Sequence, residues 1–317
     1  MHVGAKMMPC GHVVPPGEFS LCLLRKYLIK VVLYVRLVIV MIVKSVCTKL
    51  FAGRMIWMTC DVQSLCKVKS TMSSRELKAW LGGGRIVLFC GTPCEVGGLR
   101  QFLGKEYDNL ITCDIICGCV SSPMVYRTYI EFLNEKYKAK VVSVNFKDKR
   151  KGWRGKAIAV KFDDGTEYYN SILDDDYCVS FHSRYNIRPS CFNCKYGSLK
   201  RTADITLGDF WAIEKFNEHF DDNKGTSFIL TSSQKGSCLI ESLDAEVHPM
   251  TLNLKDYADK YNLRLYISPN KMDEELRRKF FLDVKDLSFD KMAVKDLLEI
   301  KEARKKRNLE TKYITTK

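Results

Sequence analysis

The sequence has no long apolar run. The uninterrupted stretch Leu37–Val43 is far shorter than the roughly 20 residues that a membrane-spanning helix requires. A secretory signal is not expected either, because His, Pro and Gly precede the apolar part and no small-residue cleavage site follows it. We therefore expect no membrane span, and an amphipathic anchor formed by Leu21–Val43 is the alternative.

Motifs of several enzyme classes are also missing. The chain contains no Walker loop, no HExxH zinc motif and no recognisable Ser-His-Asp set. A second Cys-x-x-Cys at zinc-ribbon spacing is absent, as is a nearby His pair. These absences argue against a P-loop NTPase, a zinc protease, a serine hydrolase and a zinc finger.

The net charge of +14 is unevenly distributed. Residues 1–67 carry nine Lys or Arg against two acidic residues, whereas the remaining 250 residues carry 42 basic against 35 acidic residues. The larger part therefore has an ordinary, mildly basic surface, and nucleic-acid binding is not expected. Residues 31–43 show neither strand alternation nor a helical stripe. The composition thus divides the chain near residue 68.

From Ser70 onward the pattern is that of an α/β protein. A helix is expected over Ser74–Leu81, and another opens at Ser122 with Pro123 in its first turn. Short apolar or alternating runs predict strands at 85–89, 110–117, 141–146, 157–162, 167–172, 204–207 and 227–231. We predict a mixed sheet flanked by helices, with a helical C-terminal tail and a poorly packed N-terminal segment.

The cysteines carry the clearest chemical signal. Cys191 and Cys194 form a Cys-x-x-Cys pair between cationic residues, which favour the thiolate form. Cys94 and Cys117 each follow a β-type run, and a parallel sheet gathers such positions at one edge. Four thiolates from three loops would suit a [4Fe–4S] cluster, whereas a set of ordinary buried thiols is the alternative.

Two further segments are candidate ligand loops. The first comprises Gly91, Thr92 and Pro93, with Gly97 and Gly98 beyond them. Its backbone amides could approach an anion such as a phosphate, although any strand-to-helix turn uses such residues. The second comprises Gly208, Asp209 and Trp211. Here a carboxylate and an aromatic ring directly after a strand could hold a planar cofactor, with simple packing as the alternative.

Six motifs occur in one order along the chain. They are Phe89–Leu99, Asp114–Cys117 with Ser122-Pro123, Val144–Asp148, Lys151–Trp153, Arg188–Cys194 and Asp204–Trp211. Together they resemble the beta subunit family of coenzyme F420 hydrogenase/dehydrogenase, closely over residues 70–240 and loosely to about residue 300. The resemblance implies an iron–sulfur flavoprotein with FAD and a [4Fe–4S] cluster. Such proteins pass electrons between the cluster and a two-electron carrier such as coenzyme F420.

The resemblance also implies roles for individual residues. The implied cluster ligands are Cys94, Cys117, Cys191 and Cys194, and the implied cofactor contacts are Gly91, Thr92, Pro93, Gly208, Asp209 and Trp211. The ordinary thiols are Cys90, Cys113, Cys119, Cys178 and Cys238, of which Cys119 is the strongest rival ligand. Gly118-Cys119 departs from the family's usual His-Gly, and the ferredoxin pattern of many relatives is absent.

The N-terminal segment departs from the family most strongly. Relatives have a Gly-rich loop at the flavin, and this chain shows none in the corresponding stretch. If codons are chosen freely, one common shift of the reading frame turns the codons of three stretches into family-like segments in the right order. These stretches are Val14–Phe19, Leu28–Tyr34 and Gly53–Val68. We therefore interpret residues 1–68 as an out-of-frame translation, followed by a family-like core (69–250) and a helical C-terminal extension (251–317). The nucleotide sequence of the gene tests this interpretation.

The expected function is that of an iron–sulfur flavoprotein oxidoreductase subunit in the cytoplasm, inactive if the lost Gly-rich loop is essential. Its expected partner is a redox protein or subunit, either ferredoxin-like or part of a hydrogenase or dehydrogenase. The alternative is a non-catalytic remnant or partner-binding subunit that keeps the fold without flavin. A membrane-anchored basic protein is the third hypothesis.

Overall fold

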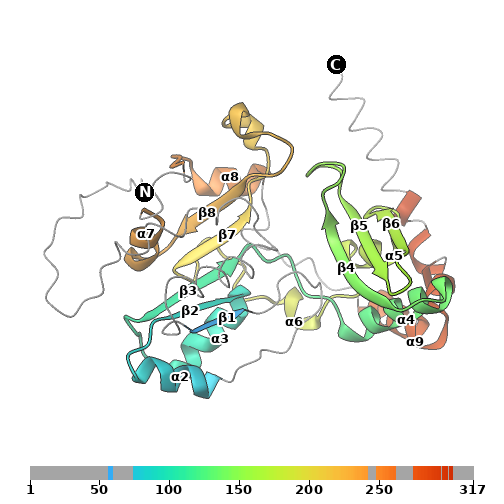
Figure 1. The fold of residues 1–317 in the computed structure, drawn as a ribbon, viewed down its shortest axis with the longest axis horizontal. Helices are drawn as coiled ribbons and strands as arrows, with labels where there is room; N and C mark the ends of the chain where they lie inside the picture. Colours follow the sequence, from blue (N-terminus) through green and yellow to red (C-terminus); the bar gives the residue numbers. More distant parts are fainter. Residues whose placement is uncertain are drawn as a thin grey trace, which may run out of the picture.

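A computed structural model describes residues 74–241, 248–261 and 274–302 (except 294 and 299), together with the strand β1 (Ile56–Thr59). The described strands form two separate sheets, a five-stranded one in the order β1-β2-β3-β7-β8 and a three-stranded one in the order β4-β5-β6. The sheets lie in different parts of the molecule (Figure 1). The predicted mixed sheet with flanking helices is confirmed.

The five-stranded sheet is mostly parallel. Its strands are β1, β2 (Val87–Gly91), β3 (Leu110–Ile115), β7 (Ile205–Asp209) and β8 (Ser227–Thr231), with only β8 antiparallel to its neighbour. Its helices are α2 (Ser74–Gly82), α3 (Pro93–Leu103), α7 (Gln234–Glu241) and α8 (Leu254–Tyr261). Apolar residues of these helices pack against the strands. Because β2 and β3 are buried, their sequences are nearly continuous apolar runs.

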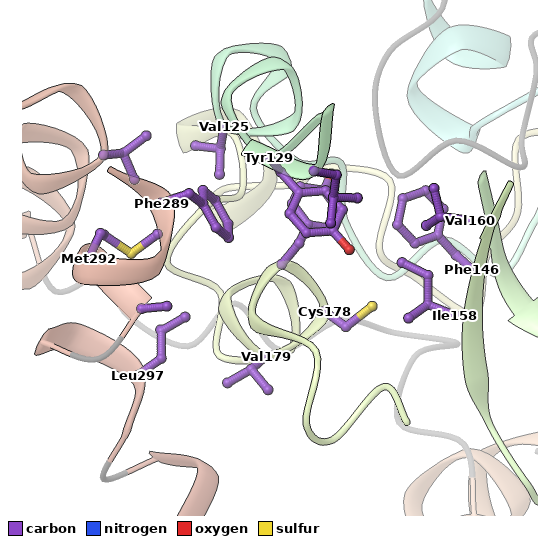
Figure 2. Packing of buried hydrophobic residues seen from close by; sticks show 14 of the residues in the cluster. Val125, Tyr129, Phe146, Ile158, Val160, Cys178, Val179, Phe289, Met292 and Leu297 are labelled. Carbon is purple, nitrogen blue, oxygen red and sulfur yellow. The ribbon is translucent and has the colours of Figure 1, made fainter. Parts of the chain in front are cut away.

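The three-stranded sheet is an antiparallel meander inserted between β3 and β7. It comprises β4 (Val141–Asp148), β5 (Ala157–Phe162) and β6 (Glu167–Ser171). Around it lie α4 (Pro123–Tyr137), α5 (Asp176–His182) and α9 (Glu274–Asp286). Figure 2 shows the buried cluster that joins them, in which Phe289 lies beside Tyr129. The sequence predicted these strands but not that they form a sheet of their own.

Short helical segments lie in and between the two parts. One is α6 (Pro189–Phe192), which precedes β7 and lies between the two sheets in Figure 1. The 3-10 turns η3 (Ile213–Lys215) and η4 (Glu218–Phe220) instead lie within the five-stranded part, between β7 and β8. In the described part of the chain, no helix has the length and apolar character needed to cross a bilayer. The anchor hypothesis for Leu21–Val43 and the predicted poor packing of residues 1–68 fall outside the described residues, except for β1.

Three strands, β2, β4 and β7, extend further than predicted, and β2 and β7 do so at the candidate ligand loops. Strand β2 continues to Gly91, which pairs with Asp114 of β3. Strand β7 continues to Asp209, which pairs with Ser227 of β8. Gly208 and Asp209 therefore belong to the strand and not to a loop after it, because the antiparallel neighbour carries the hydrogen-bonded ladder that far. Only Trp211 of this candidate loop lies beyond the strand.

Candidate functional site

The carboxyl ends of β2 and β3 begin the site. The pairing of Gly91 with Asp114 aligns the two strands, so the segments that follow them start at the same edge of the sheet. Cys94 lies in the first turn of α3, directly after β2 and not in a loop as predicted. Cys117 follows the end of β3 by two residues, and the backbone N–H of Ile116 donates to the Leu207 carbonyl.

Backbone contacts bring the Cys-x-x-Cys segment to this edge. Ser121 forms an isolated antiparallel bridge with Ile187, and the Arg188 N–H donates to the Val120 carbonyl at 2.9 Å. The chain after Cys117 therefore runs beside the chain that leads into α6, where Cys191 lies. Cys119 and Cys191 pack against the same three buried side chains, which are Phe181, Ile187 and Phe192.

A close packing contact brings the other end of the Cys-x-x-Cys segment to α3. A Cβ atom at Gly97 would collide with the ring of Tyr196. Gly97 therefore lets Tyr196 lie directly on α3, one turn after Cys94. This contact holds the residues after Cys194 against the helix that carries Cys94. Gly97 thus has a packing role in this structure, whereas the sequence pattern had suggested an anion loop.

Cys117 lies among the other thiols. Burial, followed by interactions with the thiols of Cys94, Cys119, Cys191 and Cys194, raises the pKa of Cys117 to about 12. Negative charge on any of these four thiols therefore opposes ionisation of Cys117. The sulfur atoms of the four predicted ligands are expected to lie within roughly 6–7 Å of one another, about what thiolates that share one cluster require, and this stays a prediction.

A single metal ion and an iron–sulfur cluster place different demands on a set of thiols. Among the described residues, no three His, Cys, Asp or Glu side chains are grouped closely enough to bind one ion. A tetrahedral ion holds its thiolate sulfurs about 4 Å apart. A [4Fe–4S] cluster binds each thiolate through a different iron atom and therefore accepts a wider set. Cys94, Cys117, Cys191 and Cys194 are all partly buried free thiols, and their binding of such a cluster stays a prediction.

The predicted anion loop is occupied by a side chain of the protein. The backbone N–H and the hydroxyl of Thr92 both donate to Glu95 Oε2, each at 2.8 Å. A phosphate at Gly91, Thr92 and Pro93 would have to displace this carboxylate. The Thr92 hydroxyl also lies 3.2 Å from the Cys94 sulfur, which links this turn to the cysteine site.

A cationic and aromatic group surrounds the end of β7. The ring of Trp211 lies 4.6 Å from that of Trp153 and 4.2 Å from the Lys156 Nζ atom. Lys147 Nζ donates to Asp209 Oδ2 at 2.9 Å, so β4 and β7 meet here. The Asp209 carboxylate is therefore neutralised by Lys147. A half-buried indole and an exposed cation offer a surface for a planar, anionic group.

A buried ion pair lies in the sheet next to the site, and the sequence analysis did not predict it. Asp114 is fully buried, and its Oδ2 accepts from Arg201, whose side chain is 2% exposed, at 2.9 Å. Burial raises the pKa of Asp114, while Arg201 and the Thr206 hydroxyl oppose the shift. An acidic residue within a buried strand requires a cationic partner. That requirement is the signal that could have pointed to Arg201.

The remaining cysteines in the described residues have other surroundings. Cys90 and Cys113 pair across β2 and β3, and their mutual hydrogen bond, together with burial, raises the pKa of Cys113. Cys178 is buried in the core of the three-stranded sheet. Cys238 accepts a hydrogen bond from the Gln234 amide at 3.3 Å. None of these four interacts with Cys117 in the way that Cys119 does.

Comparison with known families gives one match. A family model for the C terminus of the coenzyme F420 hydrogenase/dehydrogenase beta subunit matches residues 84–255. The matched region contains Cys94, Cys117, Cys191 and Cys194, as well as the whole of the three-stranded sheet. Among curated proteins, the comparison found no match.

Proposed function

The chain belongs to the coenzyme F420 hydrogenase/dehydrogenase beta subunit family, and we propose that it is an iron–sulfur flavoprotein oxidoreductase subunit. Its function would be to pass electrons between a [4Fe–4S] cluster, FAD and a two-electron carrier such as coenzyme F420. A beta subunit works within a multi-subunit enzyme. A hydrogenase or dehydrogenase subunit, or a ferredoxin-like protein, is therefore the proposed redox partner, and the cytoplasm is the proposed location.

The observation that carries this proposal is the set of contacts that bring the cysteine segments together, namely the Ser121–Ile187 bridge and the packing of Tyr196 on Gly97. Cys94, Cys117, Cys191 and Cys194 would hold the cluster, which supplies one-electron transfer when bound. Cys94 lies in the first turn of the 11-residue helix α3, with its sulfur 3.2 Å from the Thr92 hydroxyl. Cys117 and Cys191 are both partly buried, and Cys191 packs against apolar side chains, which would limit the access of water to a bound cluster.

The flavin contacts are proposed at the neighbouring end of β7. Trp211, with Trp153 beside it, offers a ring for stacking, and Lys156 supplies positive charge above that ring. Gly208 lacks a side chain where Ile116 approaches, so the backbones of β7 and the Cys117 segment lie close together. Gly91, Thr92, Pro93 and Asp209 complete the proposed cofactor contacts. Both proposed cofactors would thus bind at neighbouring strand ends.

The predicted loss of the Gly-rich flavin loop favours a second candidate. In that case the chain keeps the fold and the cysteine site but binds no FAD, and it acts as a partner-binding subunit. The two candidates differ in one measurable property, which is the flavin content.

Anaerobic purification of the full chain tests both candidates. We expect acid-labile sulfide, iron at about four atoms per chain and broad iron–sulfur absorbance, with flavin bands in addition. Iron without flavin would favour the partner-binding subunit. A folded chain that takes up neither iron nor flavin after anaerobic reconstitution would contradict the proposed function.

A further inference from the structure

We propose that the loop between β4 and β5 (residues 149–155) is a lid over Trp211, closed in this structure, and that Arg154 is the positioning residue that keeps it closed. The inference rests on the proposed flavin site. It goes beyond that site because it assigns a movable element to it and names the residue that controls this element. The loop contains Lys151–Trp153, one of the six ordered motifs of the sequence.

The β4–β5 loop reaches from the three-stranded sheet to the other part of the molecule. It lies against the segment that connects β7 to β8. The Trp153 N–H donates to the Asn223 carbonyl at 2.6 Å, and the Arg154 guanidinium donates to both carboxylate oxygens of Asp221, at 3.0 and 2.7 Å. A Cβ atom at Gly225 would collide with the Trp153 indole, so this ring lies directly on the backbone of that segment.

Trp153 occupies the place that a planar ligand needs. Its ring lies 4.6 Å from that of Trp211, and Lys156 Nζ lies over the Trp211 ring at 4.2 Å. Lys156 directly precedes β5, and its carbonyl accepts from the Ile172 N–H at 3.3 Å, so the three-stranded sheet holds it in place. A planar anionic group that stacks on Trp211 and keeps Lys156 beside it therefore has to displace Trp153, which lies on the loop.

The loop has the structure of an element that moves as a unit. The register of the β4–β5 ladder shifts between Asn145 and Asp148, directly before the loop, and such an irregularity is a point where a strand bends. Within the loop, the Gly152 N–H donates to the Lys149 carbonyl at 2.8 Å, and the Gly155 N–H donates to the Gly152 carbonyl at 3.2 Å. These bonds let the loop keep its own shape when it leaves Trp211.

The ion pair of Arg154 and Asp221 sets how often the lid opens. The two side chains are 48% and 21% exposed, and Arg154 Nη2 also lies 3.3 Å from Glu214 Oε2. Water and salt screen a pair of this exposure, so it stabilises the closed state only modestly. A ligand that requires the open state binds with an apparent affinity reduced by the fraction of chains that are open. Weakening this ion pair should therefore favour binding.

Hydrogen exchange and FAD titration of the full chain test this proposal. Arg154→Met should raise the exchange rates of the Trp153 and Arg154 backbone amides by about two- to fivefold, because both donate to Asn223 in the closed state. The variant should lower the Kd for FAD by the same factor, since more chains are open. Loss of a cation near an anionic ligand would by itself raise this Kd, so the direction of the change identifies the lid.

Arg150→Met is the matched control. Arg150 lies on the same loop and its side chain is 49% exposed, but it pairs with Asp148 and Glu167 of the three-stranded sheet. The variant removes the same charge without releasing the loop from the segment between β7 and β8. The exchange rates of the Trp153 and Arg154 amides should stay unchanged, and the Kd for FAD should not fall.

Two outcomes would overturn the inference alone, in a protein that binds FAD. One is an unchanged exchange rate in Arg154→Met, which would show that this side chain does not hold the loop. The other is faster exchange with a higher Kd for FAD, which would show that the loop supports the bound flavin and does not cover its site. Absence of FAD binding from the unaltered chain and from both variants would overturn the proposed flavin site together with this inference.

Discussion

The two sheets of this protein are stabilised by different chemistry. The five-stranded sheet, which carries the cysteine site, buries charged and polar groups. Asp114 is paired with Arg201, and Asp204 accepts hydrogen bonds from Thr112 and Ser233. The three-stranded sheet is covered by aromatic rings, among them Tyr129 and Tyr177, which stack at 5.0 Å. Directional hydrogen bonds and ion pairs fix geometry more narrowly than apolar contacts. The five-stranded sheet thus carries an ion pair between buried side chains, whereas the buried carboxylate of the other region, Asp175, accepts from the hydroxyls of Tyr129 and Tyr168.

The largest expected loss of stability lies in the aromatic core. Phe289 is 1% exposed, and its ring lies 5.3 Å from that of Tyr129. Phe289→Ala should lower the free energy of unfolding by about 3–5 kcal/mol, because it removes buried apolar surface and leaves a cavity. Urea unfolding measures the loss. The exposed Leu282 provides the control, since Leu282→Ala should change stability by less than about 0.5 kcal/mol.

The buried ion pair should respond differently. Arg201→Met leaves Asp114 buried without its partner and should cost about 2–4 kcal/mol. The cost is limited because burial raises the pKa of Asp114, so the unpaired carboxyl can take up a proton. The double variant D114N/R201M should recover most of the loss in the same unfolding experiment. A double variant as unstable as Arg201→Met would show that the pair is not the source of the effect.

The pH dependence of stability tests the contribution of Asp204 to the five-stranded sheet. Burial opposes its ionisation, but hydrogen bonds from Ser233 and Thr112 prevail and hold the pKa of Asp204 below its usual 3.8. Ionised Asp204 therefore stabilises the fold above about pH 4, and this stabilisation is lost as the pH falls through the folded-state pKa. Asp204→Asn should cost about 1–3 kcal/mol at pH 7. The difference from the unaltered protein should shrink below pH 4, and an increase there would contradict this assignment.

The smallest expected effect concerns the proposed flavin contacts. Lys156 lies over the Trp211 ring and is exposed. Lys156→Met should therefore weaken FAD binding by about 0.5–1 kcal/mol, or roughly two- to fivefold, with little change in stability. Titration of the iron-loaded chain with FAD measures the affinity. Lys200→Met is the control, because Lys200 is also exposed but lies on the chain before β7, and equal weakening by both would point to general loss of positive charge.

Local signals predicted much of the fold. Ser122 and Pro123 marked the start of α4 correctly, since an N-cap followed by proline is a local preference of the backbone. The division into two sheets was not predictable in the same way. Strands at 141–171 show the same short apolar runs whichever sheet they join, and their separation depends on packing against α4, α5 and α9.

The site shows the same limit. The spacing of Cys191 and Cys194 and the positions of Cys94 and Cys117 after strands are visible in the sequence. The place of Cys119 among them is not, because it depends on a bridge between residues 66 positions apart, Ser121 and Ile187. Likewise, nothing in the pattern around Gly97 shows that Tyr196 lies on it. Contacts distant in sequence decide these points.

The aromatic core has a consequence for how this protein can be divided. The family match ends at residue 255, yet the core that covers the three-stranded sheet includes Phe280, Phe289, Met292 and Leu297, all at most 1% exposed. A fragment cut at residue 255 would lack these side chains, so the side of Tyr129 that Phe289 covers in Figure 2 would face water. The region that matches the family model is therefore not expected to fold on its own. A truncated chain should extend to at least residue 302.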